Sequence, residues 1–173
     1  MIIGKPFLSV EQIQTRVAEL AEQISRDYLG REVLAVGILK GSFMFFSDLI
    51  RALRIPVSVD FILASSYVKT NSSGEVKVYY DVREDIAGRD VLLIDDIIDT
   101  GVSINFIRER LLSRGPSSLK LCMFLDKRER RMVEVPVDYI GFEIPNQFLV
   151  GYGLDYDNRY RNLPYLAIFK KET

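Results

Sequence analysis

The amino-acid sequence predicts an α/β protein whose mostly parallel central sheet is flanked by helices. Short runs of branched and bulky apolar residues, such as Val91 to Ile94, suit strands buried on both faces of a sheet that helices cover. Amphipathic segments of helical length alternate with these runs. A chain of 173 residues, 48% of them hydrophobic, is long enough to bury one core, so we expect a single domain.

The composition narrows the chemistry available to the protein. Basic and acidic residues nearly cancel, 23 against 24, so we expect no nucleic-acid or membrane-surface partner. The absence of histidine excludes Ser-His and Cys-His catalysis and every His-ligated metal site. The single cysteine, Cys122, allows neither an intrachain disulfide nor a Cys-based zinc site. We therefore expect small ligands, with acid–base chemistry supplied by carboxylates, lysines or tyrosines.

The sequence shows no pattern of export or membrane insertion. Its first residues lack the layout of a signal peptide, and no apolar run approaches the ~18 residues of a membrane span. We expect a cytoplasmic location and no membrane partner. In that setting Cys122 is interpreted as a buried packing residue rather than a nucleophile.

The helices and strands follow in chain order from their apolar periodicity. Ser9 precedes apolar residues spaced by three and four positions, and Gln12 is placed to close a capping box. An amphipathic helix is therefore expected to begin there and to end near Gly30. Further helices are expected at 43–53 and 104–112, and strands at 33–39, 57–64, 77–82, 91–94, 119–125, 137–142 and 163–169.

The stretch from Val91 to Ser103 carries the densest chemistry. Asp95 and Asp96 come where its strand is expected to end, and their carboxylates suit sugar hydroxyls or a divalent cation. In open α/β sheets, ligands bind beyond the carboxyl ends of strands, and a helix start favours an anion. We interpret the residues before the third helix as a phosphate-binding loop. This loop consists of Asp99, Thr100, Gly101, Val102 and Ser103.

Other polar segments also follow expected strand ends, and each has an ordinary alternative. Lys40 and Gly41 can hold diphosphate oxygens, or they can form a common turn with a solvated lysine. The polar residues 65–78 form a surface loop or a ribbon hanging off the sheet. A basic cluster after the strand 119–125 is expected to be a solvated face, with Lys127 as the exception because of its position. Its members are Lys127, Arg128, Arg130 and Arg131.

Together these segments resemble the type I phosphoribosyltransferases. The wording Asp-Asp-Ile-Ile-Asp-Thr-Gly at 95–101 is similar to that family's signature, although the family more often begins it with Glu-Asp. Leu-Lys-Gly-Ser at 39–42 resembles its diphosphate loop, and the segment 142–155 resembles the hypoxanthine(-guanine) branch. Members of that branch transfer a phosphoribosyl group from 5-phosphoribosyl 1-diphosphate to a purine. The resemblance implies the type I phosphoribosyltransferase fold, with a small hood and a flexible flap loop.

The resemblance assigns roles around the sugar phosphate. Asp99 would act as general acid/base toward the imidazole ring of the purine. Ser66 and Tyr67 would belong to the flap, which closes over the substrates and keeps water from a reactive sugar cation. The remaining residues are Lys40, Gly41 and Arg161 for the diphosphate, Asp95 and Asp96 for the ribose, and 99–103 for the 5-phosphate.

The resemblance also assigns the purine and metal sites. Lys127 would donate to the 6-oxo oxygen, Phe148 would stack on the base, and the Leu149 backbone would contact the base edge. From the residues alone, Phe148 is interpreted as a core residue, as an aromatic at a strand start usually is. Asp155 would bind Mg²⁺ beside the purine, with Asp95 and Asp96 as further candidate ligands. The implied substrates are 5-phosphoribosyl 1-diphosphate and a 6-oxopurine, hypoxanthine and also guanine.

The implied organisation is one domain, 1–173, with a core of about 30–140. The hood would combine the N-terminal segment with residues 142–173, and the flap loop would cover residues 65–78. Because the family commonly forms dimers and tetramers, we expect a homodimer or homotetramer.

Two other functions are alternatives to the enzyme. A regulatory protein of the same fold that binds RNA would need a basic face, and the balanced charge offers only the short cluster around Arg130. A response-regulator-like domain would carry its acidic pair after the first strand. Here Asp95 and Asp96 come much later, and a Thr-Gly phosphate loop follows them. The sequence therefore favours the enzyme.

Overall fold

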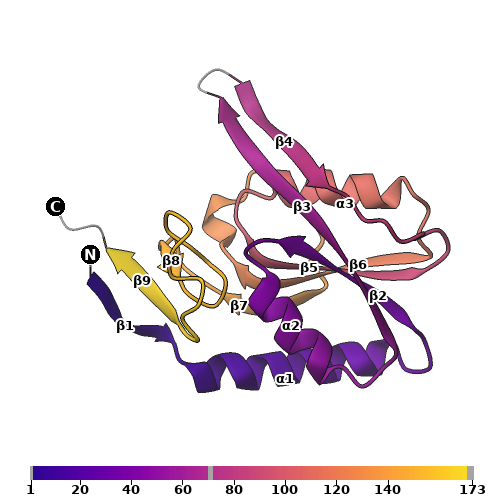
Figure 1. The fold of residues 1–173 in the computed structure, drawn as a ribbon, viewed down its shortest axis with the longest axis horizontal. Coiled ribbons are helices and arrows are strands. Elements are labelled where there is room, and N and C mark those ends of the chain that lie inside the picture. Colours follow the sequence, from indigo (N-terminus) through magenta and orange to yellow (C-terminus); the bar gives the residue numbers. More distant parts are fainter. Residues whose placement is uncertain (1, 70–71, 171–173) are drawn as a thin grey trace.

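The computed structural model describes the backbone of residues 2–69 and 72–170 and the side chains of residues 5–65 and 76–170. Its centre is a six-stranded sheet in the order β4-β3-β2-β5-β6-β7, parallel except for β4 (Figure 1). The predicted α/β fold with a mostly parallel sheet is confirmed. The strands are β2 (Val33–Leu39), β3 (Val57–Lys69), β4 (Ser72–Tyr80), β5 (Asp90–Ile98), β6 (Ser118–Asp126) and β7 (Tyr139–Glu143).

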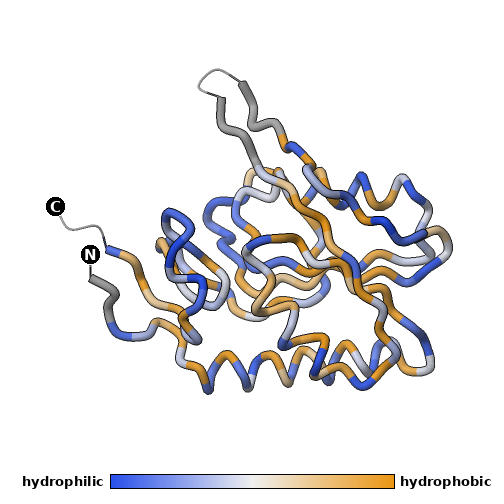
Figure 2. Tube along the Cα trace, viewed as in Figure 1, coloured by the Kyte–Doolittle hydropathy of each residue, from blue (hydrophilic) through white to orange (hydrophobic). Residues whose placement is uncertain are grey.

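Helices cover both faces of this sheet, as the apolar strand runs predict. On β5, Leu92 and Ile94 join the core under α1 (Val10–Asp27) and α2 (Phe43–Ala52). Val91 and Leu93 join a second core under α3 (Val102–Leu112). Hydrophobic residues accordingly follow the central strands, and hydrophilic ones gather in the outer turns (Figure 2). In the described part of the chain, no helix combines the length and the apolar character needed to cross a membrane.

The first helix begins where the sequence predicts. The Gln12 backbone N–H donates to Ser9 Oγ at 3.2 Å, and the Ser9 backbone N–H donates to Gln12 Oε1 at 2.9 Å, which completes the capping box. Further along, Arg16 donates to the carbonyl oxygens of Ile140 and Gly141. The helix is thereby fastened to the sheet at β7.

A second, three-stranded sheet lies beside the central one and joins both ends of the chain (Figure 1). It contains β1 (Ile2–Leu8), β9 (Leu166–Lys170) and β8 (Leu149–Val150), in that order and all antiparallel. We call this sheet, with the segment 151–165, the hood. Tyr152 ties it to α2, since its hydroxyl donates to Asp48 Oδ2 at 2.7 Å. The N-terminal segment had not been predicted as a strand.

Strands β3 and β4 continue into the stretch for which the sequence left loop and ribbon open. They pair antiparallel from Leu63 and Tyr80 to Lys69 and Ser72, so this stretch is a ribbon that projects from the sheet (Figure 1). Residues 70–71 lie outside the described part. Strand β5 is also longer than predicted, because it pairs with β6 as far as Ile98. Asp95 and Asp96 therefore lie within the strand rather than at its end.

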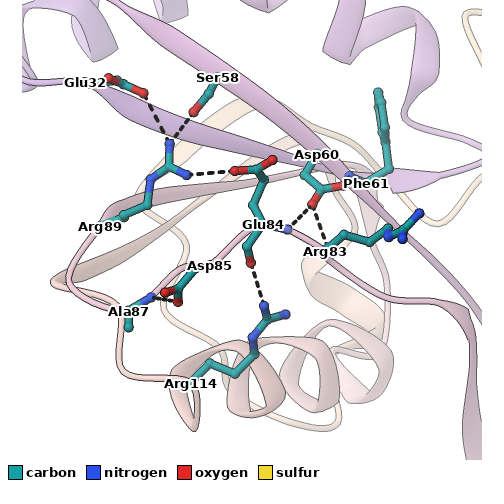
Figure 3. A network of polar contacts seen from close by, with 10 residues as sticks. All are labelled: Glu32, Ser58, Asp60, Phe61, Arg83, Glu84, Asp85, Ala87, Arg89 and Arg114. Atoms are coloured by element: carbon teal, nitrogen blue, oxygen red, sulfur yellow. Dashed lines mark hydrogen bonds and ion pairs between the residues drawn. The ribbon is translucent and has the colours of Figure 1, made fainter.

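A polar network fixes the connection between β4 and β5 to the edge of the sheet (Figure 3). Asp60, on β3, is buried and accepts hydrogen bonds from three backbone N–H groups, those of Phe61, Arg83 and Glu84, at 2.7–2.9 Å. Arg114 donates to the carbonyl oxygens of Val82 and Glu84. The bonds to Val82, Arg83 and Glu84 satisfy backbone groups of the β4–β5 connection, which lies outside the strands.

Asp60→Asn is expected to destabilise the protein. The substitution places a donor NH₂ where Oδ2 accepts two backbone N–H groups, and the loss of these charge-assisted bonds should lower the free energy of unfolding by about 2 kcal/mol. That loss corresponds to a fall in Tm of roughly 4–8 °C for a chain of this size, measurable by calorimetry. The control is Asp85→Asn, because Asp85 is exposed and, within the described part of the chain, accepts a hydrogen bond only from the Ala87 backbone N–H. Equal Tm values for the two variants would contradict the assigned role of Asp60.

Candidate active site

The candidate site lies at the switch point of the central sheet, between two neighbouring strands from which the chain continues in opposite directions. β2 and β5 are neighbours, but the chain passes from β2 to β3 on one side and from β5 to β6 on the other. In α/β sheets, ligands bind at such a switch point, beyond the carboxyl ends of the strands. The pairing of β2 with β5 stops at Gly37 and Ile94, and a cavity of about 440 Å³ lies beyond it. Seven predicted site residues line it: Lys40, Gly41, Asp95, Asp96, Ser103, Asp155 and Arg161.

Packing requires a glycine at position 41. A Cβ atom there would lie 1.9 Å from Asp96 Oδ2, so no other residue fits without moving that carboxylate. Gly153 of the hood is held as closely, because a Cβ atom on it would lie 2.0 Å from the Gly41 carbonyl oxygen. The Leu39–Lys40 peptide bond in this loop is cis. The loop after β2 is thus clamped between the acidic residue of β5 and the hood, while the Lys40 side chain is exposed.

The side-chain pKa values of Asp95 and Asp96 are both raised. The pKa of Asp95 is raised well above its ordinary value, first by burial and then by the negative charge of Asp96. Burial also raises the pKa of Asp96, against the hydrogen bonds that it accepts. Asp95 Oδ1 accepts from the Asp96 backbone N–H at 2.9 Å. Such a pair favours a ligand that brings hydroxyl donors or a cation.

The predicted phosphate loop connects β5 to α3. Gly101 caps the helix in the left-handed region at φ +85°, and a Cβ atom there would lie 2.3 Å from the Val133 carbonyl oxygen. Thr100 Oγ1 accepts from the Val102 backbone N–H at 3.4 Å. Ser103 and Ile107 line the cavity, so the first turns of α3 border it. The N-terminus of this helix is therefore available to an anion in the cavity.

Asp99 and Lys127 lie at the ends of the neighbouring strands β5 and β6, next to one another. The Lys127 backbone N–H donates to the Ile98 carbonyl at 3.0 Å, and the Lys127 side chain is buried. Burial lowers the pKa of its ammonium, against the charge of Asp99. Asp99 Oδ1 is 3.2 Å from Arg130 Nε but has no hydrogen-bond partner among the described residues. This carboxylate oxygen can accept a proton from a ligand.

The hood supplies the remaining predicted residues. Phe148 is 51% exposed and meets Tyr156 and Phe169 edge-on, with ring centroids 6.0 and 5.8 Å apart. The alternative that Phe148 is a core residue is therefore wrong. Leu149 is buried in β8. Neither residue lines the cavity described above.

Asp155 and Arg161 pair with each other across the cavity wall. Arg161 Nη2 lies 2.9 Å from Asp155 Oδ1, and Nη1 donates to the Gly153 carbonyl at 2.7 Å. Asp155 Oδ2 accepts from the Asn158 backbone N–H. Asp95, Asp96 and Asp155 offer the oxygen donors that Mg²⁺ prefers, but the described residues contain no cluster of three or more acidic, cysteine or histidine side chains that could hold a metal alone. They fit an ion that a ligand helps to hold.

The predicted flap residues and the basic cluster lie in different parts of the structure. The backbones of Ser66 and Tyr67 belong to β3, paired with Val76 and Glu75, and their side chains lie outside the described residues. Arg131 was expected on a solvated face and is instead only 10% exposed, paired with Asp126. The sequence alone gives no signal that distinguishes Arg131 from the other basic residues of the cluster. Its side chain is buried because the segment after β6 packs against the phosphate loop.

Comparison with known proteins agrees with this geometry. A family model described as a phosphoribosyl transferase domain matches residues 9–157. The hypoxanthine phosphoribosyltransferase of Salmonella typhimurium is 49% identical over 90% of this chain and 89% of its own. The hypoxanthine-guanine phosphoribosyltransferase of Mycobacterium tuberculosis strain H37Rv is 45% identical, over 95% of this chain and 85% of its own.

A solved structure gives the same result in three dimensions. The crystal structure of a hypoxanthine-guanine phosphoribosyltransferase from Bacillus anthracis superimposes with a TM-score of 0.94 at 44% identity, covering 98% of this chain and 100% of that one. The sheet order, the cavity at its switch point and these similarities agree. The chain belongs to the phosphoribosyltransferase family, in its hypoxanthine(-guanine) branch.

Proposed function

We propose that this protein transfers the phosphoribosyl group of 5-phosphoribosyl 1-diphosphate to a 6-oxopurine, hypoxanthine and also guanine, as a transferase of purine salvage. One observation carries the proposal. Residues from three distant segments of the chain, 40–41, 95–103 and 155–161, match the family's motifs for different parts of the substrate and line one cavity at the switch point of the sheet. The relatives carry the same activity in their names.

Each wall of the cavity is assigned one part of the sugar phosphate. Lys40, the Gly41 backbone and Arg161 bind the diphosphate, for which Arg161 exchanges its contact with Asp155. Asp95 and Asp96 accept hydrogen bonds from the ribose hydroxyls. The 5-phosphate binds to residues 99–103 at the start of α3. The sugar is thereby fixed at both ends, so that its anomeric carbon stays aligned with the purine.

The purine binds between the hood and the end of β6. Phe148 stacks on the ring, Lys127 donates to the 6-oxo oxygen, and the Leu149 backbone contacts the base edge. As the bond from the anomeric carbon to the diphosphate oxygen breaks, a ring nitrogen of the purine bonds to that carbon from the opposite face. Asp99 takes the proton that this imidazole nitrogen releases. Ser66 and Tyr67, at the ribbon, belong to the flap that excludes water during the step.

Magnesium and assembly complete the proposal. Asp155, Asp95 and Asp96 line the same cavity and would hold Mg²⁺ with the help of substrate oxygens. Bound Mg²⁺ supplies charge neutralisation of the departing diphosphate. We further propose a cytoplasmic protein that assembles as a homodimer or homotetramer.

The proposal predicts which bases are substrates. Turnover should be measured with 5-phosphoribosyl 1-diphosphate and Mg²⁺ against hypoxanthine, guanine, xanthine, adenine and uracil, following nucleotide formation. Product is expected with hypoxanthine and guanine. Adenine should give none, because Lys127 is a donor that suits a 6-oxo group and not a 6-amino group. Uracil should give none, because it has no imidazole nitrogen to release a proton to Asp99. Absence of product with every base, together with salt-sensitive RNA binding, would instead support the regulatory alternative.

Asp99→Asn is expected to reduce kcat by ~10²-fold or more, because an amide cannot take the imidazole proton. Its structure should be retained, since Asp99 Oδ1 has no hydrogen-bond partner in the described part of the chain. Steady-state rates with hypoxanthine measure the effect. Asp85→Asn, an exposed acid on the β4–β5 connection, is the control and should match the wild type. Near-normal turnover of Asp99→Asn would remove the assigned proton transfer.

A further inference from the structure

Arg131 contacts the phosphate loop from outside the cavity. Its Nε donates to the Asp99 backbone carbonyl at 3.2 Å. A Cβ atom on Gly101 would lie only 3.0 Å from Arg131 Cδ. The Arg131 side chain therefore packs directly against the turn that begins α3. The residue lines a separate cavity of about 210 Å³ and not the one at the switch point. Arg131 therefore contacts the phosphate loop on the side that faces away from the switch-point cavity.

The charge of Arg131 is balanced by a buried carboxylate. Arg131 Nη2 pairs with Asp126 Oδ1, and the two side chains are only 10% and 2% exposed. Asp126 ends β6, immediately before Lys127, and its carbonyl accepts from the Ile144 backbone N–H at 2.9 Å. One planar guanidinium thus joins the end of β6 to the end of β5, a geometry that its fixed fork of donors permits.

Backbone contacts repeat the same connection. The Met132 and Val133 N–H groups both donate to the Thr100 carbonyl, at 2.8 and 3.0 Å, and the Val133 carbonyl oxygen presses on Gly101. The segment 131–133 therefore supports three successive residues of the loop, Asp99 to Gly101. Arg131 differs from the backbone supports because its side chain is also paired with Asp126. Asp126 ends β6, immediately before Lys127, so Arg131 connects the loop to that strand.

We infer that Arg131, held by Asp126, is a positioning residue that sets the phosphate loop against the end of β6. It fixes the distance between the 5-phosphate site and the purine site, and this role rests on the proposed function. The productive alignment of sugar and base depends on that distance, and small displacements are costly for such reactions. Arg131 does not line the switch-point cavity and contacts the loop through the Asp99 carbonyl, so its effect passes through the backbone of Asp99.

Two substitutions separate positioning from folding. Arg131→Lys keeps a positive charge for Asp126, but a single ammonium cannot also reach the Asp99 carbonyl. Arg131→Met removes both contacts and leaves Asp126 with only the longer contact, 3.4 Å, from the exposed Arg128 among the described residues. We expect kcat/KM for 5-phosphoribosyl 1-diphosphate to fall by about tenfold or more in both variants, on the scale of misplaced substrates. The KM for hypoxanthine should change less than that for 5-phosphoribosyl 1-diphosphate. Arg131→Lys should keep a Tm near that of the wild type.

Arg114→Met is the matched control, because Arg114 also donates to two backbone carbonyls but lies just beyond the C-terminal end of α3, the end opposite the phosphate loop. Figure 3 shows its contact with Glu84. Arg114→Met should keep wild-type KM values even if its Tm falls. A folded Arg131→Lys protein with wild-type constants would overturn the inference, as would losses in the Arg131 variants no larger than in Arg114→Met. Arg131→Lys decides the question if Arg131→Met does not fold.

GMP carries both a 5-phosphate and a 6-oxopurine, so its binding reports on the two sites that Arg131 is inferred to align. Calorimetric titration with GMP therefore tests the role of Arg131 without measuring turnover. The Kd for GMP should rise about tenfold in Arg131→Lys and stay unchanged in Arg114→Met. If the wild type binds GMP but turns over no base, the proposed function fails and the GMP affinities still decide the role of Arg131. Equal GMP affinities in Arg131→Lys and the wild type would overturn that role.

Discussion

Two adjacent carboxylates, Asp95 and Asp96, occupy the point at which the central sheet opens, and the rest of the site is arranged around them. Burial raises the pKa of both, and the charge of Asp96 raises that of Asp95 further. A carboxyl whose pKa is higher in the folded state contributes stability below its unfolded pKa, and this contribution is lost as the pH rises through the folded pKa. At neutral pH the pair is therefore a strained element that a ligand with hydroxyl donors or a cation relieves.

The close packing around this pair explains the glycines of the site. Position 41 requires glycine because the Asp96 carboxylate occupies the space of a Cβ atom. Position 101 requires glycine because the Val133 carbonyl oxygen does the same. Gly153 brings the hood against Gly41 in the same way. Segments distant in sequence thus approach one another closely at these glycines, Gly41 against a side chain and Gly101 and Gly153 against backbone carbonyls. That arrangement leaves the cavity walls to Lys40, Asp155 and Arg161.

Much of the fold was predictable because its signals are local. Apolar runs locate the buried strands, and the Ser9–Gln12 capping box locates the first helix. The strand β1 was missed because its pairing partner, β9, lies at the other end of the chain, and no local pattern reports such a distant partner. Strand β5 was predicted to end at Asp95, yet acids do not end a strand whose neighbour β6 continues to pair with it.

The candidate site was predictable to a different degree. The rule that ligands bind beyond strand ends identified Lys40, Gly41 and the residues from Asp95 to Ser103, and the structure brings most of them to one cavity. Roles for Phe148, Asp155 and Arg161 came from the family resemblance and not from spacing. The burial of Arg131 was missed because it depends on how the segment after β6 returns under the phosphate loop.

The titration of the Asp95 carboxyl tests this account most directly. It can be followed by carbon-13 NMR in the wild type and in Asp96→Asn, each without ligand and with GMP and Mg²⁺. We expect a midpoint well above the ordinary value of about 4 in the free wild type, because of burial and the Asp96 charge. The midpoint should fall in Asp96→Asn and on ligand binding. A midpoint near the ordinary value in all four samples would contradict the claim that the site is built around a strained acidic pair.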